Sequence, residues 1–119
     1  MSKKMLVLVV EDEEYWQDRW KRELDGKVVL VSALSIEEAE EKFATNPDID
    51  AIVMDARMPG GSPSTTLPLV RKLREIFTGP IIASSSLGSY RQRLVQAGCN
   101  HESEKESLPQ KLLEVLGIT

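Results

Sequence analysis

The segment MLVLVVEDEE, residues 5–14, changes from six apolar residues to four acidic residues in one step. A continuous apolar run rich in Val and Leu is typical of a β-strand that is buried on both faces. Acidic residues directly after such a strand suit the first turn of a helix, where they meet the positive end of the helix dipole. The segment therefore predicts a buried strand over residues 5–10, followed by a helix.

The same alternation of short apolar runs and longer amphipathic stretches continues along the chain. Three more strands are predicted at residues 28–31, 51–54 and 81–83. Apolar residues spaced three or four positions apart predict a helix after each strand. The predicted helical faces span residues 16–24, 36–43, 67–77, 90–97 and 108–116.

Capping patterns mark the starts of two helices, whereas the fifth strand has no apolar pattern of its own. Ser35 with Glu38, and Ser107 with Gln110, form the Ser-x-x-Glu and Ser-x-x-Gln patterns of a capping box. Residues 100–104 are wholly polar, so residue propensity alone predicts no strand there. A fifth strand at this place is expected from the alternation only.

Strands that alternate with helices form βαβ units, which give a parallel sheet with helices on both faces. Right-handed crossovers restrict the topology further. Five such units in 119 residues suit a doubly wound α/β fold of the flavodoxin-like kind, with a five-stranded parallel sheet in the order 2-1-3-4-5. Because the length is that of one domain and no linker is visible, residues 1–119 are expected to form a single domain.

Composition excludes several classes of protein. The net charge of −4 provides no basic face for nucleic acid. Cys99 is the sole cysteine, so no intramolecular disulfide can form, as suits a reducing cytoplasm. The apolar runs are too short for a signal peptide or a membrane span. His101 has too few neighbouring ligands to make a zinc site.

Acidic residues stand at the ends of the first and third predicted strands. In an open parallel sheet the ligand site lies at the carboxyl ends of the strands, where the strand order reverses. In the flavodoxin-like order that point falls between strands 1 and 3, so Glu11 and Asp12 are expected to meet Asp55. Three carboxylates repel one another unless a cation neutralises them. Because no His or Cys is placed to join them, Mg²⁺ is the preferred ion.

The ends of the fourth and fifth strands supply a hydroxyl and a cation. Ser84, Ser85 or Ser86 follows the fourth strand, and Lys105 follows the fifth. With the acids, these groups suit phosphoryl transfer, in which a metal ion and a lysine neutralise the transferred oxygens while a carboxylate attacks. Taken singly, each group has an ordinary explanation, such as a helix start, a turn or a surface lysine. Chance does not explain why an acid pair, a further acid, a hydroxyl and a lysine all stand at strand ends in this order.

These residues lie in motifs that resemble the receiver domain of two-component response regulators, over essentially the whole chain. Residues 9–13, VVEDE, resemble the acidic motif of its first strand, and residues 55–59, DARMP, resemble its phospho-acceptor motif D-x-x-M-P. Residues 80–85, PIIASS, resemble its fourth-strand motif. Residues 96–100, QAGCN, resemble its A-G-A-D segment, and counting on from them puts Lys105 at the position of the family's invariant lysine.

The resemblance implies a role for each residue of the acidic pocket. Asp55 would take a phosphoryl group from a histidine kinase or a histidine phosphotransfer protein. Mg²⁺ would be held by Asp12, Asp55 and the backbone carbonyl of Arg57, with Glu11 acting mainly through water. Lys105 would pair with the acceptor carboxylate and then with the phosphoryl oxygens.

The resemblance also implies how the signal leaves, and here the chain departs from the family. Ser85, with Ser84 as the alternative, would carry the change to a protein-interaction face. Glu102 stands where receivers have an aromatic switch residue, and Glu106 replaces the proline that follows the lysine. The loop of residues 60–66 is longer than usual, and the stretch 85–98 is shorter. These departures concern the output face more than the acidic pocket.

Three functions are therefore considered. The first is a phosphorylation-dependent switch, which modifies itself and dephosphorylates slowly instead of turning over a substrate. The second is a pseudo-receiver that docks a partner without phosphorylation. The third is a hydrolase with an Asp nucleophile, but such enzymes carry D-x-D, and Arg57 stands at the second acid's place. Because no output domain is visible, the signal is expected to leave through contact with a downstream protein, whether the chain stands alone or was excised from a longer one.

Overall fold

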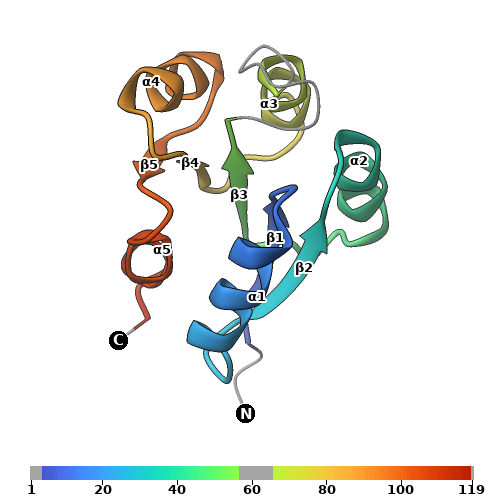
Figure 1. Ribbon diagram of the computed structural model, residues 1–119. Helices are drawn as coiled ribbons and strands as arrows, with labels where there is room; N and C mark the ends of the chain where they lie inside the picture. Colours follow the sequence, from blue (N-terminus) through green and yellow to red (C-terminus); the bar gives the residue numbers. More distant parts are fainter. Residues whose placement is uncertain (1–3, 57–65, 119) are drawn as a thin grey trace.

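The computed structural model describes residues 4–56 and 66–118. Within them, five strands and five helices alternate along the chain (Figure 1). They are β1 (Leu6–Val10), α1 (Glu14–Glu23), β2 (Val29–Ala33), α2 (Ile36–Thr45), β3 (Ala51–Asp55), α3 (Leu67–Arg74), β4 (Ile81–Ser84), α4 (Gly88–Ala97), β5 (His101–Ser103) and α5 (Leu108–Leu116). The predictions for Arg57 and for the loop of residues 60–65 lie outside the described residues.

The five strands form one parallel sheet in the order β2-β1-β3-β4-β5, which confirms the flavodoxin-like topology. β1 lies between β2 and β3, with Leu6 opposite Val29 of β2 and Val7 opposite Ala51 of β3. The chain therefore leaves β1 toward β2 on one side and enters β3 on the other. This reversal of strand order opens a crevice at the carboxyl ends of β1 and β3.

Helices cover both faces of the sheet, which confirms the doubly wound arrangement. α1 and α5 lie on one face, and α2, α3 and α4 lie on the other (Figure 1). Successive residues of a strand point to opposite faces. In β3, Ala51 and Val53 pack into the core under α1 and α5, whereas Ile52 and Met54 pack into the core under the other three helices. Burial on both faces explains why β1 and β3 are apolar almost throughout.

The helix starts follow the predicted capping signals at one position and not at the other. The Ser35 hydroxyl accepts a hydrogen bond from the Glu38 N–H at 3.1 Å, as the capping box predicts. The prediction for Ser107 is wrong, because its side chain makes no cap hydrogen bond. Its ψ of 0° already turns the chain into a helical course, whereas a capping serine needs an extended backbone. Proline near the start of α5 suits that position instead.

Two other elements differ from the sequence-based expectations in extent. α1 begins only at Glu14, so Glu11 precedes the helix and stays at the end of the strand. β5 is a short strand of polar residues, paired through His101 with Ile82 and through Ser103 with Ser84. Its neighbour β4 supplies the pairing that its own composition does not predict. No helix within the described ranges combines the length and the apolar character that a membrane crossing needs.

Candidate functional site

The three acidic residues expected at the switch in strand order come together there. Glu11 follows β1 directly, and Asp55 is the last residue of β3. One carboxylate oxygen from each of Glu11, Asp12 and Asp55 lies within 4.8 Å of the other two, and we call these three residues the acid cluster. Glu11 and Asp55 are buried, and Asp12 is partly buried. The topology thus brings together acidic groups that lie more than forty positions apart in the sequence.

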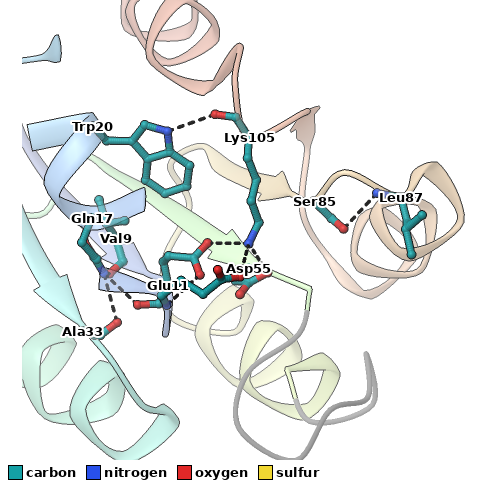
Figure 2. Close-up of polar contacts among 10 residues, drawn as sticks. Val9, Glu11, Gln17, Trp20, Ala33, Asp55, Ser85, Leu87 and Lys105 are labelled. Carbon is teal, nitrogen blue, oxygen red and sulfur yellow. Dashed lines mark hydrogen bonds and ion pairs between the residues drawn. The ribbon is translucent and has the colours of Figure 1, made fainter. Parts of the chain in front are cut away.

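Lys105 extends from the β5–α5 connection into the acid cluster (Figure 2). Its ammonium nitrogen lies 2.8 Å from Oε1 of Glu11 and 3.5 Å from Oδ1 of Asp55. A third carboxylate oxygen, on the exposed Glu13, lies 3.9 Å away. The side chain of Lys105 is 12% exposed and that of Glu11 is fully buried, so the closest ion pair is largely shielded from water.

Burial and charge oppose each other at this ion pair. Burial raises the pKa of the Glu11 carboxyl, although the hydrogen bond and the positive charge of Lys105 act in the other direction. Burial alone would lower the pKa of Lys105, but the hydrogen bond to Glu11 and the charge of Asp55 raise it above its ordinary value. The lysine is therefore charged at neutral pH.

Glu11 is held in place by groups that the sequence analysis did not single out. Its backbone N–H donates to the Ala33 carbonyl at 3.0 Å, and its carboxylate accepts the Glu13 N–H at 3.0 Å. The amide nitrogen of Gln17 donates to the carbonyls of Val9, Glu11 and Ala33, at 3.1, 3.0 and 3.3 Å (Figure 2). Gln17 is buried, and a polar residue on the apolar face of α1 was the signal that could have revealed it.

The composition of the acid cluster fits a magnesium ion. Its three carboxylates face one ammonium group, so in the ionised state the buried charges do not balance. All of the side-chain ligands are hard oxygen atoms, and no His or Cys belongs to the cluster. Mg²⁺ is commonly held by one or two carboxylates together with water and phosphate oxygens. The residues present therefore fit such an ion, while the carbonyl of Arg57 is outside the described residues.

The serines after β4 differ in their contacts. Ser84 lies opposite Asp55 in the sheet and is fully buried, and its hydroxyl has no hydrogen-bond partner among the described residues. The Ser85 hydroxyl accepts the Leu87 N–H at 3.2 Å and is turned toward α4 and away from the carboxylates (Figure 2). Both serines therefore stay candidates for the hydroxyl of the site.

Arg91 of α4 connects Ser85 to the position where receivers carry an aromatic residue. Its guanidinium donates to the Ser85 carbonyl at 2.7 Å and pairs with the Glu102 carboxylate at 3.0 Å. Glu102 is thus part of a polar link between β5 and the β4–α4 turn. Glu102 stands out in the sequence but Arg91 does not, because eleven residues and a change of element separate the two.

Comparisons with known proteins identify the fold. No protein-family model matches the chain, and no curated protein matches it. Among solved structures, a two-component response regulator from Clostridium difficile has a TM-score of 0.82 and 21% identity, with 96% of this chain and 97% of that chain covered. The signal receiver domain of a response regulator from Bermanella marisrubri has a TM-score of 0.77 and 20% identity, with 96% and 99% covered. The N-terminal domain of the nisin resistance regulator NsrR has a TM-score of 0.78 and 21% identity, with 96% and 99% covered. The chain therefore has the fold of response-regulator receiver domains.

Proposed function

We propose that this chain, which has the receiver fold, is a phospho-acceptor switch of a two-component phosphorelay. In this proposal Asp55 takes a phosphoryl group from a histidine kinase or a histidine phosphotransfer protein, in the presence of Mg²⁺ and in the cytoplasm. The observation that supports it most is the placement of the Lys105 ammonium between the carboxylates of Glu11 and Asp55. A nucleophilic carboxylate, an acidic metal-binding set and a fixed cation are the parts that phosphoryl transfer needs.

The chemistry follows from the positions of these groups. An oxygen of Asp55 forms a bond to phosphorus while the bond from phosphorus to the donor's histidine nitrogen breaks, and that nitrogen keeps the electron pair. Mg²⁺ held by Glu11, Asp12 and Asp55 would supply positive charge against the phosphoryl oxygens. Lys105 already lies next to the acceptor and neutralises charge that develops there. The acyl phosphate then hydrolyses slowly, so the protein acts as a switch and not as a turnover enzyme.

The switch requires that phosphorylation changes a surface that a downstream protein reads. In this proposal the hydroxyl of Ser85, or that of Ser84, turns toward the phosphoryl group and so stabilises a second arrangement of the β4–α4 turn. The Ser85 hydroxyl now binds the Leu87 N–H, so this turn would exchange one hydrogen bond for another.

A second candidate function is docking of a partner without phosphorylation. The link from Arg91 to Glu102 and to the Ser85 carbonyl favours it, because this link ties the β4–α4 turn to β5 through contacts that involve no residue of the acid cluster. The complete acidic pocket favours the switch. The two functions differ in one observable, which is whether Asp55 reacts.

The deciding experiment is incubation with Mg²⁺ and acetyl phosphate, followed by intact-mass measurement, and titration with beryllofluoride. We expect one phosphoryl group on the wild type and none on Asp55→Asn. Asp18→Asn, which changes an exposed carboxylate on α1, is the matched control and should react like the wild type. If the folded wild type neither reacts nor binds beryllofluoride, the docking function replaces the switch.

Metal binding is tested separately from phosphorylation. Asp12→Ala removes one ligand of the acid cluster, so we expect its Mg²⁺ affinity to fall at least about ten-fold in calorimetric titration. The same Asp18→Asn variant is the control for a general loss of negative charge. An unchanged affinity in Asp12→Ala would remove the magnesium site as drawn.

A further inference from the structure

The part of the chain that carries Lys105 contributes little packing of its own. Lys105 lies between Ser103, the end of β5, and Leu108, the start of α5. Its neighbours Glu104 and Glu106 are both exposed, so their side chains do not anchor the connection. The Lys105 ammonium nevertheless lies 2.8 Å from a fully buried carboxylate. A turn hydrogen bond from the Ser107 N–H to the Glu104 carbonyl orders the connection locally, and a group outside it that binds the Lys105 backbone would fix that backbone relative to the acid cluster.

The indole of Trp20 is that group. Its Nε1–H donates a hydrogen bond of 3.0 Å to the backbone carbonyl of Lys105, across 85 positions of sequence (Figure 2). The Trp20 side chain is fully buried and packs with Leu108 and Leu112 of α5. Because this donor is fixed in the core, it restricts the position of the Lys105 carbonyl more than a mobile surface donor would. A second donor to this carbonyl, the Leu108 N–H, is farther away at 3.4 Å.

Trp16, one helical turn before Trp20, lies beside the other end of the lysine. The two rings contact each other with centroids 5.6 Å apart, and the Lys105 ammonium lies 5.9 Å from the Trp16 ring centroid. At that distance a ring face attracts a cation. One indole thus fixes the backbone of Lys105, and the second borders the space in which its ammonium moves.

We propose that Trp20 is a positioning residue for Lys105, and that α1 therefore organises both halves of the site. The helix begins three residues after Glu11, and its second turn holds the backbone from which Lys105 extends. This inference rests on the proposed phosphoryl transfer for its kinetic consequence, but the positioning itself also predicts an equilibrium effect. Without the indole N–H, we expect the position of Lys105 to be less restricted, while the carboxylates of the acid cluster keep their positions.

The kinetic experiment compares Trp20→Phe with the wild type in modification by acetyl phosphate at saturating Mg²⁺. We expect the maximal rate to fall at least about ten-fold, since small misplacements of a charged group weaken its effect on the reaction strongly. The Mg²⁺ concentration for half-maximal rate should change less than about two-fold, because no metal ligand is altered. Leu24→Val changes an apolar residue of the same core that has no polar group to bind Lys105, so it controls for a loosened helix and should leave both quantities unchanged.

A double-mutant cycle separates positioning from general damage. If Trp20 acts through Lys105, then Trp20→Phe changes the rate less than about two-fold when it is made in the Lys105→Met protein. A full ten-fold loss in that background would show damage unrelated to the lysine and would overturn the inference. If Trp20→Phe does not fold, replacement of only the indole N–H of residue 20 by sulfur, as benzothienylalanine, keeps the ring and removes the donor.

An equilibrium measurement keeps this inference distinct from the proposed function. The coupling between Lys105→Met and Glu11→Gln in urea unfolding reports how well the ion pair is held, and it needs no phosphoryl donor. We expect this coupling to be lower in the Trp20→Phe background by at least about three-fold in the unfolding equilibrium constant. If the coupling falls but acetyl phosphate does not modify the protein, only the phosphorylation proposal is overturned. Unchanged coupling overturns the role of Trp20, whether or not Asp55 reacts.

Discussion

Removal of the charge of Lys105 tests the electrostatics on which the site depends. Lys105→Met keeps an unbranched side chain, shorter by one heavy atom, and deletes the ammonium. At the observed 2.8 Å from Glu11, the gross attraction is about 6 kcal/mol for an effective dielectric constant of about 20. The contact to Asp55 at 3.5 Å has a gross attraction of about 5 kcal/mol on the same basis. Desolvation of both partners offsets much of this attraction.

The net effect is the penalty of a buried carboxylate that has lost its partner. Such changes lower the free energy of unfolding by about 3–5 kcal/mol. A chain of 119 residues has about 6–18 kcal/mol in total, so the variant should still fold. Burial raises the pKa of Glu11, and without the ammonium that pKa rises further. The folded state then prefers neutral Glu11, and this preference is lost as pH rises through the raised pKa, so the variant should be less destabilised at pH 5 than at pH 8.

The assay is urea unfolding at pH 7, followed by tryptophan fluorescence and circular dichroism, with EDTA or with Mg²⁺. Lys111→Met is the matched control, because its pair with Glu114 at 3.7 Å is exposed and should contribute less than about 1 kcal/mol. Saturating Mg²⁺ should stabilise Lys105→Met more than the wild type, since the ion replaces missing positive charge. If Lys105→Met in EDTA loses no more stability than Lys111→Met, the shielded ion pair does not exist as described.

Three further predictions concern residues outside the acid cluster. Burial raises the pKa of the Cys99 thiol to about 12, so the unfolded chain ionises first and stability should fall by about 1.4 kcal/mol per pH unit above pH 9. Unfolding of Cys99→Ala at pH 8 and pH 10 should lack this part of the pH dependence. Ser35→Ala should lose about 1 kcal/mol in chemical denaturation and Ser107→Ala less than about 0.5 kcal/mol, because only Ser35 caps its helix. Arg91→Ala should lower the thermal stability by about 1–2 kcal/mol, since it leaves the Ser85 carbonyl without its guanidinium donor, whereas Glu102→Gln at the exposed end of the link should change it by less than about 0.5 kcal/mol.

The sequence predicted those strands that are strongly buried. It did not predict features that depend on neighbouring elements and not on burial. β1 and β3 are continuously apolar because both of their faces are covered, and that pattern is visible in the residues alone. β5 has no such pattern, since His101 and its neighbours are polar and their pairing comes from β4. Ser107 carried a capping pattern, but the preceding turn set a backbone angle at which its hydroxyl cannot cap.

The same division holds within the candidate site. Glu11, Asp12, Asp55 and Lys105 were predicted because each stands at or just after the end of a strand, and parallel strands place their carboxyl ends at one edge. Gln17 was missed, because it binds the backbone carbonyls of Val9 in β1, Ala33 in β2 and Glu11 just after β1. The residue types at those three positions do not indicate such contacts. A hydrogen bond to a backbone carbonyl imposes no residue type on the partner, so no motif records it.

The sequence by itself determined the order of strands and helices and the end of the sheet where acids and a lysine gather, because hydrophobic periodicity and chain connectivity are local properties. The tertiary structure alone decided which groups hold them there. Trp20 reaches the carbonyl of Lys105 only because α1 and α5 pack side by side on one face of the sheet. A contact of this kind depends on the distance and orientation between elements far apart in the chain, and packing is what sets both.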